Sequence, residues 1–173
     1  MRIAFILLLL SISSLLFSQN NFAKELNQII KDSANHFSKF KGGFKEMHDQ
    51  DSVFYSTMTL EGTRENDIII TQILTQYRSE IIDSINEKKG RKIIDEWHEK
   101  LVGVFTGKFQ SEKRKIESWS LMKYGWSFKN GNTWVDISLL PINVNSSKYF
   151  VSLAVTYFSR DFYKLHQSLP SLS

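Results

Sequence analysis

An asparagine–glycine pair between two alternating stretches limits the folds open to this chain more than any other local feature. The pair is Asn130-Gly131 in the stretch MKYGWSFKNGNTWVDISLL, and Asn-Gly is the favoured pair for a two-residue hairpin turn. With these two residues as the turn, Phe128 faces Thr133 and Tyr124 faces Ile137. One side of the ribbon is then apolar and the other mostly polar, which predicts an antiparallel sheet packed on one face.

Further strands are predicted on both sides of this hairpin. The stretch DSVFYSTMTLEG (51–62) is rich in β-branched and aromatic residues, and EGTRENDIIIT (61–71) indicates a turn and a returning strand. The three consecutive isoleucines at 68–70 place apolar side chains on both faces of that strand. We therefore expect the tail or a partner to cover part of the second face. A last strand is predicted in KYFVSLAVTYF (148–158).

Helical periodicity appears in two parts of the chain. Apolar residues between positions 22 and 40 recur at spacings of three, four and seven, which predicts a helix over about residues 21–40, ended by Gly42-Gly43. The same periodicity returns over residues 77–85 and again over 93–104, on either side of Gly90. A glycine inside a helix costs only about 1 kcal/mol relative to alanine. The pattern therefore allows either one long helix or two.

The predicted order of elements is one helix, two strands, one or two helices and three strands (α-ββ-α(α)-βββ). This order indicates the α+β class, as a two-layer sandwich in which amphipathic helices pack on one face of an antiparallel sheet of about five strands. Residues 19–173 have a suitable length for a single domain with one core.

The first 18 residues, MRIAFILLLLSISSLLFS, have the pattern of a cleavable signal peptide. The apolar stretch is shorter than the roughly 20 residues that a membrane-spanning helix needs, and serines interrupt it. Cleavage is expected between Ser18 and Gln19, which leaves a mature form with no transmembrane helix. The chain has no cysteine. An exported chain without disulfides fits a bacterial periplasm or exterior better than an animal secretory pathway. The N-glycosylation sequon at 145–147 keeps the animal secretory pathway as an alternative.

The charge pattern bears on possible partners. The formal net charge is +4, and residues of both signs are interspersed along the chain, which gives solubility without a strong preference for polyanions. Two small basic clusters, NEKKGRK (86–92) and SEKRKIE (111–117), are both flanked by glutamate. Nucleic acid is therefore not an expected partner. An anionic envelope surface is the electrostatic alternative.

No complete catalytic motif is found, and no cofactor is expected. The stretch WHEKLV (97–102) begins like a zinc-protease helix, but Val102 stands where the second histidine is required. Asp95, His98 and Glu99 lie within one turn of the predicted helix, so they form the alternative metal site. The loop that holds His48, Asp49 and Asp51 is a second candidate for the site of a small hydrolase or metal-dependent enzyme.

The preferred binding candidates lie on and near the polar side of the hairpin. The predicted register places Trp134 across from Ser127 and beside Asp136, and Lys123 lies on the same side. Trp119 adds a further aromatic group nearby. Exposed aromatic residues on a sheet are a common binding element, although a loop or the C-terminal segment covering Trp134 is an equal alternative.

Three hypotheses of function follow from the sequence. The first is an exported, non-enzymatic binding domain whose partner is an unknown protein or envelope ligand. The second is a small secreted hydrolase or metal-dependent enzyme. The third is a peripheral binder of an anionic envelope surface. The sequence does not determine the oligomeric state.

Overall fold

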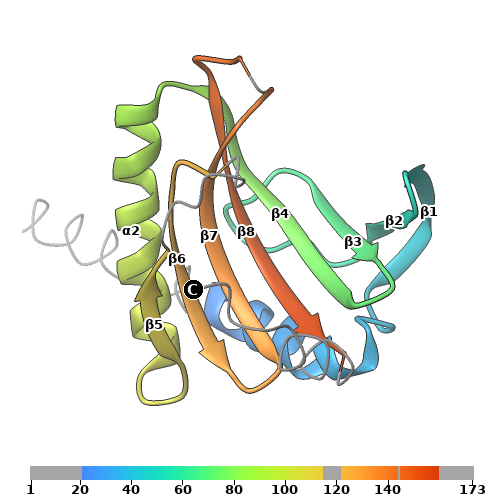
Figure 1. Ribbon diagram of the computed structural model, residues 1–173. Helices are drawn as coiled ribbons and strands as arrows, with labels where there is room; N and C mark the ends of the chain where they lie inside the picture. The colour runs from blue at the N-terminus through green and yellow to red at the C-terminus, as the bar shows by residue number, and fades with distance from the viewer. Residues whose placement is uncertain (1–20, 115–121, 144, 160–173) are drawn as a thin grey trace, which may run out of the picture.

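The computed structural model describes residues 21–114, 122–143 and 145–159 (Figure 1). The predicted signal peptide with its Ser18–Gln19 cleavage site, Trp119 and the tail beyond residue 159 lie outside the described residues. No described helix combines the length and the apolar composition that crossing a membrane requires.

The described chain is built on one antiparallel sheet of eight strands in the order β1-β2-β3-β4-β8-β7-β6-β5. The prediction of a two-layer sandwich with about five strands is therefore wrong. The strands are β1 (Lys41–His48), β2 (Asp51–Ser56), β3 (Asn66–Ile70), β4 (Leu74–Ile85), β5 (Gln110–Lys113), β6 (Tyr124–Asn130), β7 (Thr133–Pro141) and β8 (Tyr149–Phe158).

The largest error concerns β4, where helical periodicity over residues 77–85 predicts a helix. Its apolar residues satisfy helical spacing, yet Thr75, Tyr77 and Ser79 are buried in strict alternation. Pairing with β3 on one side and β8 on the other satisfies the backbone of β4, so tertiary contacts override the local pattern. The strands β1 and β5 also escape prediction, because these edge strands are mostly exposed and polar.

The predicted hairpin is present, with its pairing shifted by two residues. The strands β6 and β7 flank a turn at residues 131–132, and Gly131 takes a φ of 54°. Phe128 pairs with Val135 instead of Thr133, and Trp134 pairs with Lys129 instead of Ser127. A shift of two residues leaves every side chain on its predicted face.

Two α-helices accompany the sheet in the part of the chain that the structure describes. The first covers residues 21–32 and ends eight residues earlier than predicted, in the short 3-10 helix η1 (Ser33–Asn35). The second, α2 (Glu87–Phe105), is a single helix that contains Gly90. A Cβ atom at Gly90 would lie 2.4 Å from the Leu139 side chain, so the glycine permits close contact between α2 and β7.

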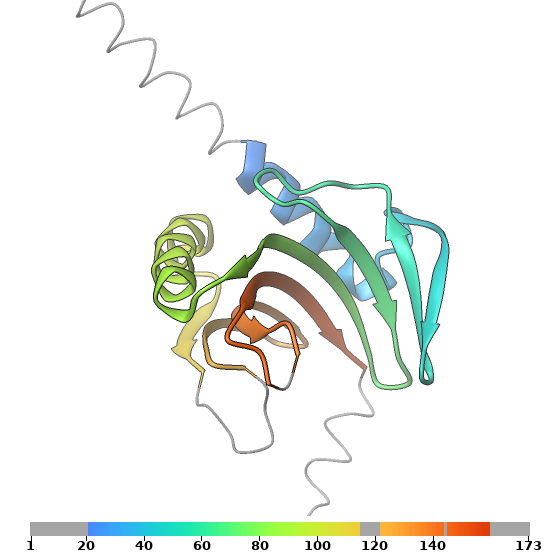
Figure 2. The same cartoon turned by 90° about the horizontal axis from the view of Figure 1, so that it is seen from above.

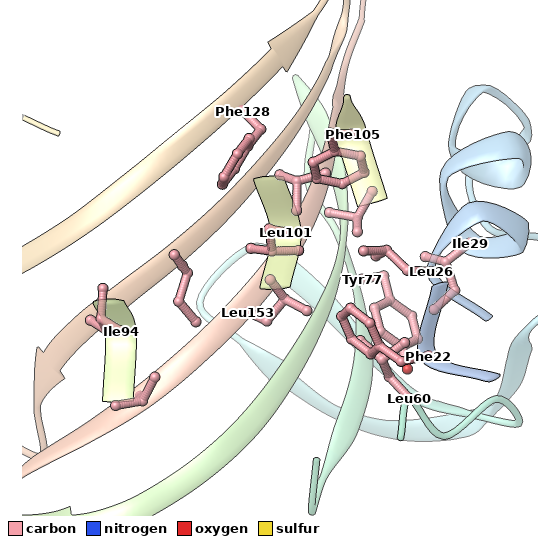
Figure 3. Packing of buried hydrophobic residues seen from close by; sticks show 14 of the residues in the cluster. Phe22, Leu26, Ile29, Leu60, Tyr77, Ile94, Leu101, Phe105, Phe128 and Leu153 are labelled. Atoms are coloured by element: carbon pink, nitrogen blue, oxygen red, sulfur yellow. The ribbon is translucent and has the colours of Figure 1, made fainter. Parts of the chain in front are cut away.

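Both helices contribute side chains to one core (Figure 3). Phe22, Leu26 and Ile29 come from helix 21–32, and Ile94 and Leu101 come from α2. They pack with buried residues of the sheet such as Tyr77, Phe128, Val135 and Leu153. This packing defines one face of the sheet as the core face.

The sheet is bent. Its register shifts twice near the end of β4, between Glu80 and Ile82 and between Ile82 and Ile85, and such irregularities bend a strand. In Figure 2, β4 and β8 follow nested arcs, and helix 21–32 lies on the outside of these arcs. The face turned away from this helix therefore lies on the inside of the bend.

Candidate functional site

The candidate site is the face of the sheet opposite the core face, which we call the polar face. Side chains alternate between the two faces of a strand, so Asp67, Arg78 and Asp136, next to the core residues Ile68, Tyr77 and Val135, point away from the core. The strand pairings place these residues in one row across the sheet. The row consists of Tyr55, Asp67, Arg78, Ala154, Asp136, Ser127 and Glu112.

Asp67 is the centre of an ion cluster on β1, β3 and β4. Both of its carboxylate oxygens accept hydrogen bonds from Lys45 Nζ at 3.1 Å, and Arg78 Nη2 lies 3.7 Å from Oδ2. Burial alone would lower the pKa of Lys45, but the hydrogen bond to Asp67 and the nearby acidic charges raise it. Lys45 therefore stays charged and holds the buried Asp67 carboxylate.

A small hollow adjoins this cluster. Its volume is about 160 Å³, and its lining consists of Glu65, Asp67, Arg78, Glu80, Phe150 and Ser152. Burial, together with the charges of Asp83 and Glu65, raises the pKa of Glu80. The hollow therefore combines one guanidinium with several carboxyl groups.

Asp136 forms a second cluster toward the opposite edge of the sheet. The hydroxyl of Ser127 donates a hydrogen bond to Asp136 Oδ1, and Arg114 Nη1 lies 3.7 Å from the same oxygen. Arg114 also donates to Ser138 Oγ at 3.4 Å. Burial raises the pKa of Asp136, although Arg114, Ser127 and Lys129 act in the opposite direction. The carboxyl group is therefore enclosed by partners from β6 and by Arg114, which directly follows β5.

Trp134 lies on the polar face, as the sequence predicts. Its ring packs against Phe158 with the ring centroids 4.9 Å apart, and Lys129 Nζ lies 4.1 Å from the ring centroid. Lys129 also forms an ion pair with Glu112. The indole is partly exposed, so neither full exposure nor full coverage describes it.

The structure brings together only part of the predicted binding set. Trp134 and Asp136 lie two residues apart on the same face of β7. Lys123 is exposed just before β6, and its backbone N–H donates to the Leu139 carbonyl. The sequence does not predict a site at Lys45, Asp67 and Arg78, because it predicts only one of the three strands that carry them. The alternation of Thr75, Tyr77 and Ser79 is the signal that identifies β4 as a strand.

The residues of the alternative metal site are engaged in other contacts. The Tyr124 hydroxyl donates to Asp95 Oδ1 at 2.7 Å. The His98 ring stacks on Trp126 with the centroids 3.9 Å apart, and His98 Nδ1 lies 3.3 Å from Glu99 Oε1. Within the described ranges, no group of three or more His, Cys, Asp or Glu side chains is close enough to hold a metal ion.

His48 lies at the end of β1, where its Nδ1 is 3.7 Å from Asp49 Oδ2, and both side chains are highly exposed. The basic residues of the cluster 86–92 lie on α2, where Arg91 pairs with Glu87 and Lys92 with Glu96. These pairs neutralise part of the charge that an anionic surface would attract. Part of the second basic cluster lies outside the described residues.

No protein-family model, curated protein or solved structure matches this chain. The geometry of the polar face is therefore the basis for inferring a function.

Proposed function

We propose that this chain is an exported, non-enzymatic binding domain whose polar face holds a partner protein or an envelope ligand.

The proposal rests mainly on the exposure of Arg78, which lies near the middle of the face. Its side chain is 45% exposed. Within the described part of the chain, its ionic partner is Asp67 at 3.7 Å, and Lys45 already binds that carboxylate. A guanidinium has five N–H donors suited to carboxylate or phosphate groups. Arg78 therefore offers donors to a partner.

Aromatic side chains paired with cations flank Arg78 in both directions across the sheet. Lys45 Nζ lies 5.4 Å from the Tyr55 ring centroid, and Lys129 Nζ lies 4.1 Å from that of Trp134. Tyr, Trp and Arg are the residues that most often dominate the energy of a protein interface. A face that combines all three favours binding of a polar partner over an apolar one.

The spacing of the buried acids supports binding over hydrolysis. Asp67 and Asp136 lie on β3 and β7, three strands apart in the sheet, which corresponds to about 14 Å. Carboxylate pairs that hydrolyse glycosides are about 5–10 Å apart. Each of these two acids is also bound to a cation or a hydroxyl group. Asp67 and Asp136 are therefore too far apart to form such a pair.

Site-specific photocrosslinking in the producing cell tests the proposal. A benzoylphenylalanine at Tyr55 points from the polar face, and the same probe at Phe44 points from the opposite side of the same hairpin. The two positions are matched in exposure, at 54% and 57%. We expect a discrete adduct from position 55 that Arg78→Ala weakens, and no such adduct from position 44. Equal adducts from both positions, or an adduct insensitive to Arg78→Ala, would contradict the proposal.

Export is tested separately by the mass of the mature protein. A mass that begins at Gln19, in the periplasmic or extracellular fraction, supports cleavage after Ser18. Retention of the full-length chain in the cytoplasm would refute the exported part of the proposal and leave the binding face untouched.

A further inference from the structure

A second concave site lies away from the polar face, where the turn after helix 21–32 meets the β3–β4 hairpin and the end of β8. Its volume is about 320 Å³, which is at the lower end of the range for small-molecule sites. Ile70, Ile73, Leu74 and Tyr157 supply apolar lining, and His36 and Thr75 supply polar groups. The site thus has the composition expected for a small amphipathic ligand.

The backbone at His36 is held in an unusual conformation. His36 and Phe37 have φ values of 55° and 53°, in the left-handed region that non-glycine residues rarely adopt. A single left-handed residue is a common end of a helix, but the second is not needed for that purpose. The fully buried Phe37 side chain anchors the turn, and the Asp32 carboxylate accepts a hydrogen bond from Lys39 N at 2.9 Å. These contacts fix a strained turn that places the His36 ring at the site.

The His36 ring is oriented by two neighbours. His36 Nδ1 lies 2.9 Å from Thr75 Oγ1, and the ring meets Tyr157 edge to face with the centroids 6.1 Å apart. Thr75 is buried, so its hydroxyl cannot easily exchange this bond for one with water. When the Thr75 hydroxyl donates to Nδ1, the ring proton lies on Nε2, and Nε2 can donate a hydrogen bond to a ligand.

The chemistry of the lining favours one class of ligand. The remaining polar groups come from Thr71, Gln72 and Ser159, and the described lining contains no Asp or Glu. The described lining contains no Lys or Arg either, and its hydroxyl and amide groups can donate to a carboxylate or accept from an ammonium group. The imidazole N–H of His36 is therefore the group that favours a carboxylate over an ammonium group. We propose that this hollow binds a small carboxylic acid with a compact apolar body. The carboxylate accepts a hydrogen bond from His36 Nε2, and the apolar body packs against Ile70, Leu74 and Tyr157.

Three probes with one apolar body and different head groups test the proposal: 4-phenylbutyrate, 4-phenylbutan-1-ol and 4-phenylbutylamine. Binding to the full chain is followed by amide chemical shifts in NMR. Small ligands of this size bind in about the millimolar range. We expect the carboxylate to bind about tenfold or more tightly than the amine, because a hydrogen bond to a charged group supports a difference of this size. The largest shifts should map to the turn at His36 and the β3–β4 hairpin.

Two variants separate the head group from the apolar body. His36→Asn tolerates the left-handed backbone and should remove the preference for the carboxylate while retaining weak binding of all three probes. Ser159→Trp should fill the hollow and abolish binding, whereas Ser147→Trp, at an exposed position in the β7–β8 connection, should have no effect. Equal affinity for the amine and the carboxylate overturns the proposal, as does binding that survives Ser159→Trp. If no probe binds but Ser159→Trp changes the sedimentation coefficient, the hollow is a contact between copies of the chain and the proposal is equally wrong.

Discussion

Asn66 connects three hydroxyl groups under the β3–β4 ladder, and its replacement by alanine gives a sharp prediction. Asn66 Oδ1 lies 2.7 Å from the Tyr77 hydroxyl, 2.7 Å from Ser79 Oγ and 3.0 Å from Thr63 Oγ1. Two of these hydroxyls have a second acceptor, because Tyr77 also reaches the Met58 carbonyl and Thr63 reaches the Leu60 carbonyl. Among the described hydrogen bonds, Asn66 is the acceptor for the fully buried Ser79.

Asn66→Ala should therefore leave one buried hydroxyl without an acceptor. A buried polar group without a hydrogen-bond partner lowers the free energy of unfolding by about 1–3 kcal/mol, and each further lost hydrogen bond lowers it by about 1 kcal/mol. We expect the free energy of unfolding to fall by about 2–3 kcal/mol, which corresponds to a decrease in Tm of roughly 5–10 °C for a chain of this size. Tyr77→Phe should cost only about 1 kcal/mol, because the Asn66 and Met58 oxygens keep other donors.

A double-mutant cycle in urea supplies the decisive measurement. Ser79→Ala removes the hydroxyl that Asn66→Ala leaves without an acceptor. The double variant Asn66→Ala/Ser79→Ala should therefore be about 1 kcal/mol more stable than the sum of the two single effects predicts. Thr106→Ala, at an exposed hydroxyl at the end of α2, serves as the control and should change stability by less than about 0.5 kcal/mol. Strict additivity of Asn66→Ala and Ser79→Ala would refute the reasoning.

Three further predictions concern other parts of the fold. Burial raises the pKa of Asp136 above its ordinary value of 3.8. The stability that the protonated Asp136 contributes is therefore present below pH 3.8 and is lost as the pH rises through the folded-state pKa. Asp136→Asn should raise Tm at pH 7, and this gain should shrink toward about pH 4. A gain that is independent of pH would contradict this. Gly90→Ala should lower stability, because overpacking against Leu139 costs about 1–3 kcal/mol and outweighs the roughly 1 kcal/mol by which alanine favours a helix. In a Leu139→Val background, urea unfolding of Gly90→Ala should show that part of the lost stability is recovered. Lys100 Nζ lies 3.7 Å from the Phe22 ring centroid and 4.6 Å from that of Trp97. Lys100→Met should therefore lower the free energy of unfolding by about 1 kcal/mol, and Lys100→Arg should lower it less. Equal urea midpoints for these two variants would show that the charge is irrelevant.

The sequence predicts the centre of the sheet better than its edges. Around Asn130-Gly131, apolar and polar residues alternate on both sides of a strong turn signal, so every side chain of this hairpin was assigned to its correct face. By contrast, β1 and β5 bury little and have no alternating pattern to detect. The strand β4 was mistaken for a helix because the isoleucines at 81, 82 and 85 fit a helical spacing, and the register shifts at these positions break the strand alternation.

The candidate site was predicted only where this hairpin contributes to it. Trp134 and Asp136 were found because their faces follow from the turn. The cluster of Lys45, Asp67 and Arg78 joins three strands, two of which were not predicted, and no local pattern brings its members together. Likewise, the hollow at His36 depends on a left-handed turn of two non-glycine residues, for which the sequence carries no signal.

The strand order has a consequence for how the chain reaches its folded state. The strands β1 to β4 pair with their neighbours in sequence, and so do β5 to β8. Among the described strands, the β4–β8 ladder joins the two halves of the sheet. That ladder joins residues such as Gln76 and Thr156, which are 80 positions apart. Long-range pairing of this kind is slow, since the entropy of closing the intervening chain is lost before any contact forms. During synthesis, the backbone groups on one edge of β4 therefore stay unpaired until β8 has been made. In that interval this edge can pair with a strand of another molecule.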